Sequence, residues 1–243
     1  MRFPVPLSEF SVSGENDAVT NNGTNPLEAK EFHKIIWLTP LVFWFLQLAF
    51  LPALCYYRPT HYMFRYLLIF LGVIFTDAWL ASGWTFVGGP DTALFVVQTF
   101  IFVVLGDVRY FLLIFHFGVS PTKALLKSLI PSSTITLLEI AIHYFYFTTV
   151  PNLQTIFLIY EGAYVVFLPT MYYFFLRKGK NFMTDDIRIW LTRVTKYEFF
   201  QYFTWFVSDI IVAAGSNFGY WPRTGADLAY YCFFLPYVLW TLP

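Results

Sequence analysis

Five acidic side chains lie inside long apolar runs of this 243-residue chain, and they are the residues best suited to chemistry: Asp77, Asp107, Glu139, Glu161 and Asp209. An acid near a bilayer centre costs roughly 2.5–3.5 kcal/mol or more unless it is paired or neutral, so such residues usually face a bundle interior and mark a functional site. Burial disfavours the charged form of a carboxyl group. A buried carboxyl group can therefore keep its proton and act as an acid.

The aromatic content suits the same chemistry, because Phe, Tyr and Trp make up 23% of the residues. Aromatic faces attract cations by roughly 0.5–2 kcal/mol each. A pocket that holds a protonated carboxyl group among such rings can protonate an apolar substrate and steer the resulting carbocation. Most of the rings must instead contact lipid or form belts at the membrane surface.

Asp77, Glu161 and Asp209 are the leading candidates for catalytic acids, and we expect them to converge on one aromatic-lined cavity. Small residues nearby are expected to make room for it, namely Gly83, Gly162 and Ala213. Glu139 and His143 lie one helical turn apart on one face, where they either lock a helix by a hydrogen bond or join the site.

Asp107 and Arg109 stand two residues apart and so do not face each other on a helix. We expect a structural charge pair, in which each finds its partners on other helices. Asp107 is also expected nearer the cytosolic side than the other four acids.

The sequence lacks the residue patterns that several other kinds of functional site require. The adjacent Asp185 and Asp186 have no third acid for a magnesium-dependent diphosphate site. Four histidines and two separated cysteines favour neither a zinc site nor a disulfide framework. Fifteen basic and 15 acidic residues cancel, which leaves no basic face for nucleic acid. We therefore expect no metal, no cofactor and no nucleic-acid partner; the oligomeric state stays open.

The elements that must position these acids are membrane spans. Charged residues are only 12% of the chain, about half the usual share. Apolar runs that could cross a ~30 Å hydrocarbon core recur seven times: at 35–57, 63–87, 92–117, 122–148, 154–177, 194–215 and 225–242. The sequence thus predicts an all-α, seven-helix transmembrane bundle over residues 31–243, preceded by a flexible polar tail over residues 1–30.

Basic residues set the predicted orientation. Nine of them occur in the first, third and fifth connections: Arg58, Arg65, Lys123, Lys127, Arg177, Lys178, Lys180, Arg188 and Arg193. The even connections hold only Arg223. We expect a multi-pass protein of the endoplasmic reticulum with a cytosolic C-terminus and a lumenal N-terminus, where Asn22 begins a glycosylation acceptor pattern.

An internal repeat is also predicted. FTDAWLASGWTFVGGP (75–90) aligns with VSDIIVAAGSNFGYWP (207–222), which places Asp77 on Asp209. The alignment suggests that spans 1–3 and 5–7 are parallel repeats joined by a linker helix. Asp91 and Asp227 would then cap the N-termini of spans three and seven.

With seven spans, scattered acids and no metal motif, the chain resembles the fungal integral-membrane terpene cyclases of meroterpenoid secondary metabolism. The resemblance implies protonation and cyclisation of a farnesyl chain, usually epoxidised, on a phenol or polyketide. The family's essential acids would match Asp77 and either Asp209 or Asp227. One branch has a Trp-Glu pair where this chain has Thr76-Asp77-Ala78-Trp79, so the chain looks more like the ascofuranone-, ilicicolin- or drimane-forming branch.

A second resemblance lies at the C-terminus. AAGSNFGYW (213–221) and DLAYYCFFLPYVLWTLP (227–243) are similar to the sterol-isomerase-like module of emopamil-binding proteins. That resemblance also implies protonation of an olefin, with aromatic stabilisation of the cation.

We therefore expect a metal-free membrane cyclase or isomerase that acts on a hydrophobic prenylated small molecule. A sterol-isomerase-like enzyme and a small proton-coupled transporter are the alternatives. The transporter is favoured by the 3+1+3 repeat and by prolines expected to break spans: Pro40, Pro131, Pro169 and Pro236. A third alternative is a ligand-binding scaffold that catalyses no reaction.

Overall fold

The computed structural model describes residues 39–57, 61–81, 93–115, 120–146, 153–181 and 183–242. These ranges are helical and contain no strand. The helices are α3 (Thr39–Tyr57), α4 (His61–Ala81), α5 (Ala93–Phe115), α6 (Pro121–Tyr146), α7 (Leu153–Arg177), α8 (Asp185–Ala213), α9 (Tyr220–Leu228) and α10 (Phe234–Trp240). A π-helical turn, Ala229–Phe233, joins α9 to α10 in one continuous segment. The predicted all-α class is confirmed.

Seven helical segments thus occupy the described ranges when α9, the π-helical turn and α10 are counted as one. None of the helices in these ranges combines the length and the apolar character that a membrane crossing requires.

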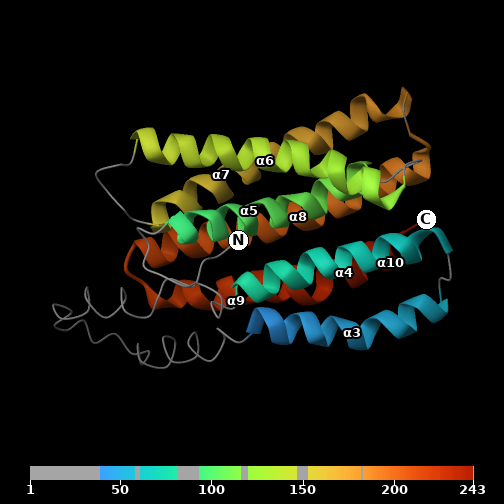
Figure 1. Ribbon diagram of the computed structural model, residues 1–243, viewed down its shortest axis with the longest axis horizontal. Coiled ribbons are helices and arrows are strands. Elements are labelled where there is room, and N and C mark those ends of the chain that lie inside the picture. Colours follow the sequence, from blue (N-terminus) through green and yellow to red (C-terminus); the bar gives the residue numbers. More distant parts are fainter. Residues whose placement is uncertain are drawn as a thin grey trace.

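The helices lie side by side along the long axis and run in alternating directions (Figure 1). The chain packs α7 against α8 and places α5 between α4 and α6. The segment α9–α10 lies against α3 and α8. Helices α4 and α8 therefore run the same way, as the predicted repeat requires; the repeat itself stays a prediction.

Helix α8 begins nine residues before the predicted sixth span. Thr184 has extended backbone angles and occupies the N-cap position without a side-chain hydrogen bond to the helix, and Asp185 and Asp186 occupy the first turn, where carboxylates favour the helix dipole. Gly215 ends it with a φ of +85°, and the amide of Ser216 donates to the carbonyl of Ile211. Such a left-handed glycine is a common helix stop. The early start places residues near 198 well inside the helix.

The C-terminal segment corrects a prediction. Asp227 lies near the end of α9, which begins at Tyr220, so it does not cap a helix N-terminus. Helices α6 and α7 also continue through Pro131 and Pro169. The expectation that these prolines break their spans is wrong.

The interior of the bundle is mainly apolar, but it also holds polar and charged side chains. Buried polar residues include Gln47, Asp77, Asp107, Arg109, Ser128, Ser132, Thr136, Glu161, Thr195, Glu198, Gln201, Ser208 and Asp209. Large apolar side chains are exposed on the outer faces, such as Ile130 and Val166, each 69% exposed, and Phe200 at 65%. The buried charged side chains and the exposed large apolar side chains are both uncommon in a water-soluble domain.

Glycine is required at position 219 because the backbone there approaches α8 closely. A Cβ atom there would lie 2.5 Å from the carbonyl oxygen of Ser208 and 2.7 Å from Cγ2 of Val212. We expect Gly219→Ala to lower the free energy of unfolding by about 1–3 kcal/mol, since overpacking forces a backbone shift. Gly225→Ala is the matched control, because a Cβ there meets nothing within 4 Å. Equal thermal unfolding midpoints for the two variants would contradict the packing.

Candidate active site

Asp77 lies on α4, four residues before Ala81, with its side chain 1% exposed. The hydroxyl of Tyr230, from the π-helical turn, donates to Oδ2 of Asp77 at 2.6 Å. The other oxygen, Oδ1, has no hydrogen-bond partner within the described residues. One oxygen of this carboxyl group is thus held in place while the other is available to carry a proton.

Arg109 of α5 stands beside this pair as a buried cation, 1% exposed. Its guanidinium carbon lies 3.4 Å from the ring centroid of Tyr230 and 4.3 Å from that of Phe234. Its Nη2 donates to Oε2 of Glu198 at 3.0 Å and, more weakly, to Oε1 of Gln201 at 3.4 Å. The site therefore already stabilises a cation with aromatic faces and one carboxylate.

A second Asp–Tyr pair is formed by Asp107 of α5. Tyr160 of α7 donates its hydroxyl proton to Oδ1 of Asp107 at 2.5 Å. Its hydroxyl also lies 3.4 Å from that of Tyr202 on α8, and the rings of Tyr202 and Tyr164 stack at 4.4 Å. Asp107 thus has a tyrosine donor, as Asp77 does.

Trp205 of α8 links the two Asp–Tyr pairs. Its ring lies 5.1 Å from that of Tyr230 and 5.4 Å from that of Tyr202, while its indole Nε1 donates to Oδ1 of Asp227 at 3.0 Å. The acid–aromatic cluster consists of Asp77, Asp107, Arg109, Tyr160, Tyr164, Glu198, Gln201, Tyr202, Trp205, Asp227, Tyr230 and Phe234. It draws residues from α4, α5, α7, α8 and the C-terminal segment.

Asp107 and Arg109 each bond to residues of other helices, Asp107 to Tyr160 and Arg109 to Glu198. Sequence reasoning did not include Glu198 among the buried acids, because it placed that residue at the edge of a span. The acidic first turn at Asp185 and Asp186 was the signal that the helix begins earlier.

The three leading acids are all buried, at 1% exposure or less. Asp209 forms an ion pair with Arg223, with Oδ1 and Nη1 3.2 Å apart. Glu161 lies on α7 beside Gly162, and the space beside this glycine is filled by Phe206, whose Cε2 would lie 3.1 Å from an added Cβ. Convergence of Asp77, Glu161 and Asp209 on one cavity stays a prediction.

Several other predicted positions lie beyond what the structure describes. Glu139 and His143 belong to α6, but their side chains fall outside the described part of the chain. Asn22, Gly83 and Asp91 lie outside the described ranges altogether. Ala213 is exposed at the end of α8 and so does not line a buried space.

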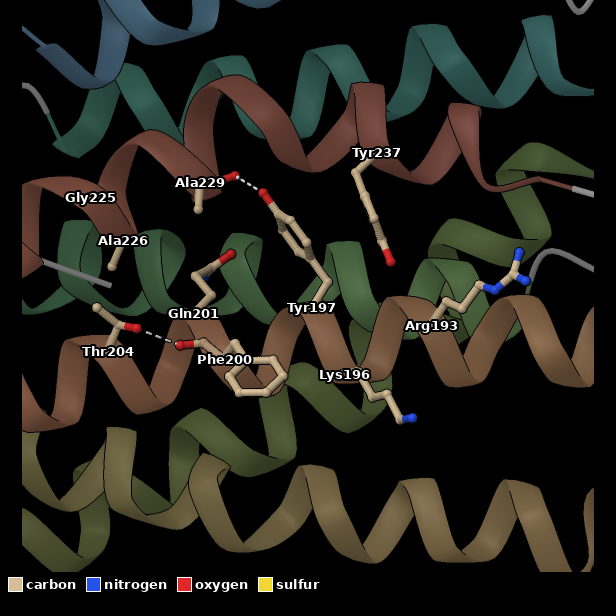
Figure 2. A pocket seen from close by; sticks show the side chains of 10 residues that line it. All are labelled: Arg193, Lys196, Tyr197, Phe200, Gln201, Thr204, Gly225, Ala226, Ala229 and Tyr237. Atoms are coloured by element: carbon tan, nitrogen blue, oxygen red, sulfur yellow. Dashed lines mark hydrogen bonds between the residues drawn. The ribbon is translucent and has the colours of Figure 1, made fainter.

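A groove opens between α8 and the C-terminal segment beside the acid–aromatic cluster (Figure 2). This α8–α9 groove has a volume of about 360 Å³ and is lined by Arg193, Lys196, Tyr197, Phe200, Gln201, Thr204, Gly225, Ala226, Ala229 and Tyr237. Gln201 also contacts Arg109. One side chain therefore connects the groove to the cluster.

Charge balance limits what the cluster can do. Asp77, Asp107 and Glu198 surround a single buried cation, Arg109. Isolated buried charges are costly and Glu198 already pairs with Arg109, so we infer that Asp77 and Asp107 hold protons on their carboxyl groups. Such a group beside aromatic faces suits proton transfer to an apolar substrate. Within the described residues, no three His, Cys, Asp or Glu side chains group together as metal ligands.

Comparison with protein families, curated proteins and solved structures finds no match to this chain.

Proposed function

We propose that this protein is a membrane-bound terpene cyclase that protonates the prenyl chain of a phenol or polyketide and guides the cyclisation of the carbocation. The observation that carries the proposal is the Asp77 carboxyl group, buried with Oδ2 held by Tyr230 and with Oδ1 uncommitted among the described residues. A general acid needs this combination of fixed position and available proton.

The aromatic surroundings support the second half of the reaction. Arg109 lies against the faces of Tyr230 and Phe234, so these rings already stabilise positive charge out of water. Glu198 offsets the charge of Arg109, which reduces its repulsion of a nearby carbocation. A carbocation beside Tyr230 or Trp205 would gain roughly 0.5–2 kcal/mol from each ring that it faces.

A seven-helix bundle that spans the membrane of the endoplasmic reticulum is part of the proposal. It is supported by the exposed apolar side chains of the outer faces and by the polar groups gathered inside. An intramembrane site would admit a prenylated substrate directly from the lipid.

A direct test is to incubate microsomes that contain the protein with a farnesyl-phenol epoxide, with EDTA present throughout. The expected product has the mass of the substrate and a new ring system, because cyclisation by protonation is redox-neutral and returns the proton. A sterol substrate that is isomerised instead would favour the sterol-isomerase-like alternative. Unchanged epoxide, with the protein folded and abundant, would overturn the cyclase.

Orientation gives a separate prediction. We expect a tag at the C-terminus to be digested when intact microsomes are treated with protease, and a tag at the N-terminus to be protected, because basic residues favour cytosolic connections. Detergent should expose both tags. A protected C-terminal tag would contradict the orientation.

A further inference from the structure

The α8–α9 groove has an ordered arrangement along its length (Figure 2). Arg193 and Lys196 stand at one end of its α8 wall and Thr204 at the other, a distance of roughly 16 Å at 1.5 Å per residue. Tyr197 and Phe200 lie between these ends. Cations at one end and aromatic rings beyond them match a ligand with an anionic head and an apolar chain.

The opposite wall is made of small residues and, toward the cation end, of Tyr237, whose ring stacks on that of Tyr197 at 4.5 Å. Gly225, Ala226 and Ala229 come from α9 and the start of the π-helical turn. A Cβ at Gly225 would meet nothing within 4 Å, so the groove is open there. The hydroxyl of Tyr197 donates to the carbonyl of Ala229 at 2.8 Å, a bond that joins the two walls of the groove.

Gln201 is a groove residue with a buried donor atom that lacks a hydrogen-bond partner among the described residues. Its side chain is 3% exposed, and its Oε1 accepts from Arg109, which can only donate. The amide nitrogen Nε2 has no hydrogen-bond partner in the described part of the chain. A buried donor without a partner costs about 1–3 kcal/mol.

We propose that the α8–α9 groove binds the substrate, with a carboxylate or phenolate head at Arg193 and Lys196 and with the prenyl chain along Tyr197 and Phe200. The inference rests on the proposed function for the fate of the ligand, but the binding itself can be measured separately.

The charges around the head position are consistent with an anion. Lys196 Nζ lies 5.1 Å from the ring centroid of Tyr172, and Lys196 forms no ion pair with the residues that the structure describes. Arg193 also lines a neighbouring hollow of about 720 Å³, to which Asp186 contributes the acid among the lining residues. The head end of the groove thus carries two cations, with one acid in the adjoining hollow.

The test uses two photoreactive probes that share a chain and differ in the head: a diazirine derivative of farnesoic acid and the same derivative of farnesol. Protein in phosphatidylcholine vesicles is labelled, and the modified peptides are mapped. We expect the acid to label residues 193–204 and 225–237 about 1.5- to fivefold more strongly than the alcohol, the range that exposed ion pairs give. Arg193→Gln with Lys196→Gln should remove this preference.

Gly225→Leu should fill the groove and reduce labelling by both probes about tenfold. Gly72→Leu on α4 is the matched control, since a Cβ there also meets nothing within 4 Å, and it should label as the wild type does. Folding of each variant is checked by its thermal unfolding midpoint.

Labelling that persists in Gly225→Leu, or equal labelling by acid and alcohol in the wild type, would overturn the groove assignment. Loss of labelling when phosphatidylglycerol replaces part of the vesicle lipid would make the groove a lipid site and would also overturn it. Failure of the cyclase proposal alone can be distinguished from failure of the groove assignment. In that case the wild type would bind the acid in the groove yet leave the farnesyl-phenol epoxide unchanged.

Discussion

Product formation by Asp77→Asn should fall about 10²–10⁴-fold below that of the wild type, the usual contribution of a general acid. Asn keeps the size of the side chain and an oxygen that can accept from Tyr230, but it has no transferable proton. The measurement is the initial rate of epoxide conversion in microsomes, at protein levels matched by immunoblot.

The controls for this prediction separate chemistry from packing. Thr76→Val, at the exposed neighbour of Asp77, should leave the rate unchanged. Asp209→Asn should lower the rate less, because the Asp209 carboxyl group is already engaged in an ion pair with Arg223. A wild-type rate in Asp77→Asn would remove Asp77 as the donor and leave Glu161, Glu139 and His143 to be tested.

The largest effect on stability is expected at the buried ion pair of Arg109 and Glu198. Glu198→Gln should cost about 3–5 kcal/mol, because it leaves the guanidinium buried without its counter-charge. For a chain of this size that loss corresponds to a thermal unfolding midpoint lower by about 10 °C or more. The midpoint can be followed by intrinsic fluorescence in lipid nanodiscs.

An exposed pair provides the comparison. Arg188 and Asp185 lie 2.6 Å apart near the start of α8, with the Asp185 side chain 77% exposed. Arg188→Gln should change stability by less than about 1 kcal/mol. The double variant Arg109→Met with Glu198→Leu should recover much of the loss, because buried pairs can often be replaced by apolar residues. Equal shifts in Glu198→Gln and Arg188→Gln would contradict the buried pair.

The helices could be predicted from the sequence because each corresponds to an apolar run. Hydropathy gave the position of α7, predicted at 154–177 and observed at Leu153–Arg177, almost to the residue. It failed at α8, where the first turns are polar and the boundary is set by the cap at Thr184 and the charges of Asp185 and Asp186. The same error placed Asp227 at a helix N-terminus, since α9 begins at Tyr220.

The acids could be predicted, but their partners could not. An isolated acid in an apolar run is visible locally, and Asp77, Glu161 and Asp209 are indeed buried. The bond from Tyr230 to Asp77 joins residues 153 positions apart, and nothing local distinguishes Tyr230 from the other tyrosines. The hydrogen bond between Tyr230 and Asp77 depends on the π-helical turn Ala229–Phe233 and on how the C-terminal segment packs. The pairing of Glu198 with Arg109, 89 positions away, could not be predicted for the same reason.

The most direct test of the central claim is whether Asp77 holds a transferable proton in the resting protein. Infrared spectra of the wild type and of Asp77→Asn in lipid, recorded in water and in D₂O, would resolve the carbonyl stretch of a protonated carboxylic acid. We predict such a band in the wild type, shifted by D₂O and missing or diminished in Asp77→Asn. A band of equal intensity in both proteins, or no band in either, would contradict the assignment of Asp77 as the proton donor.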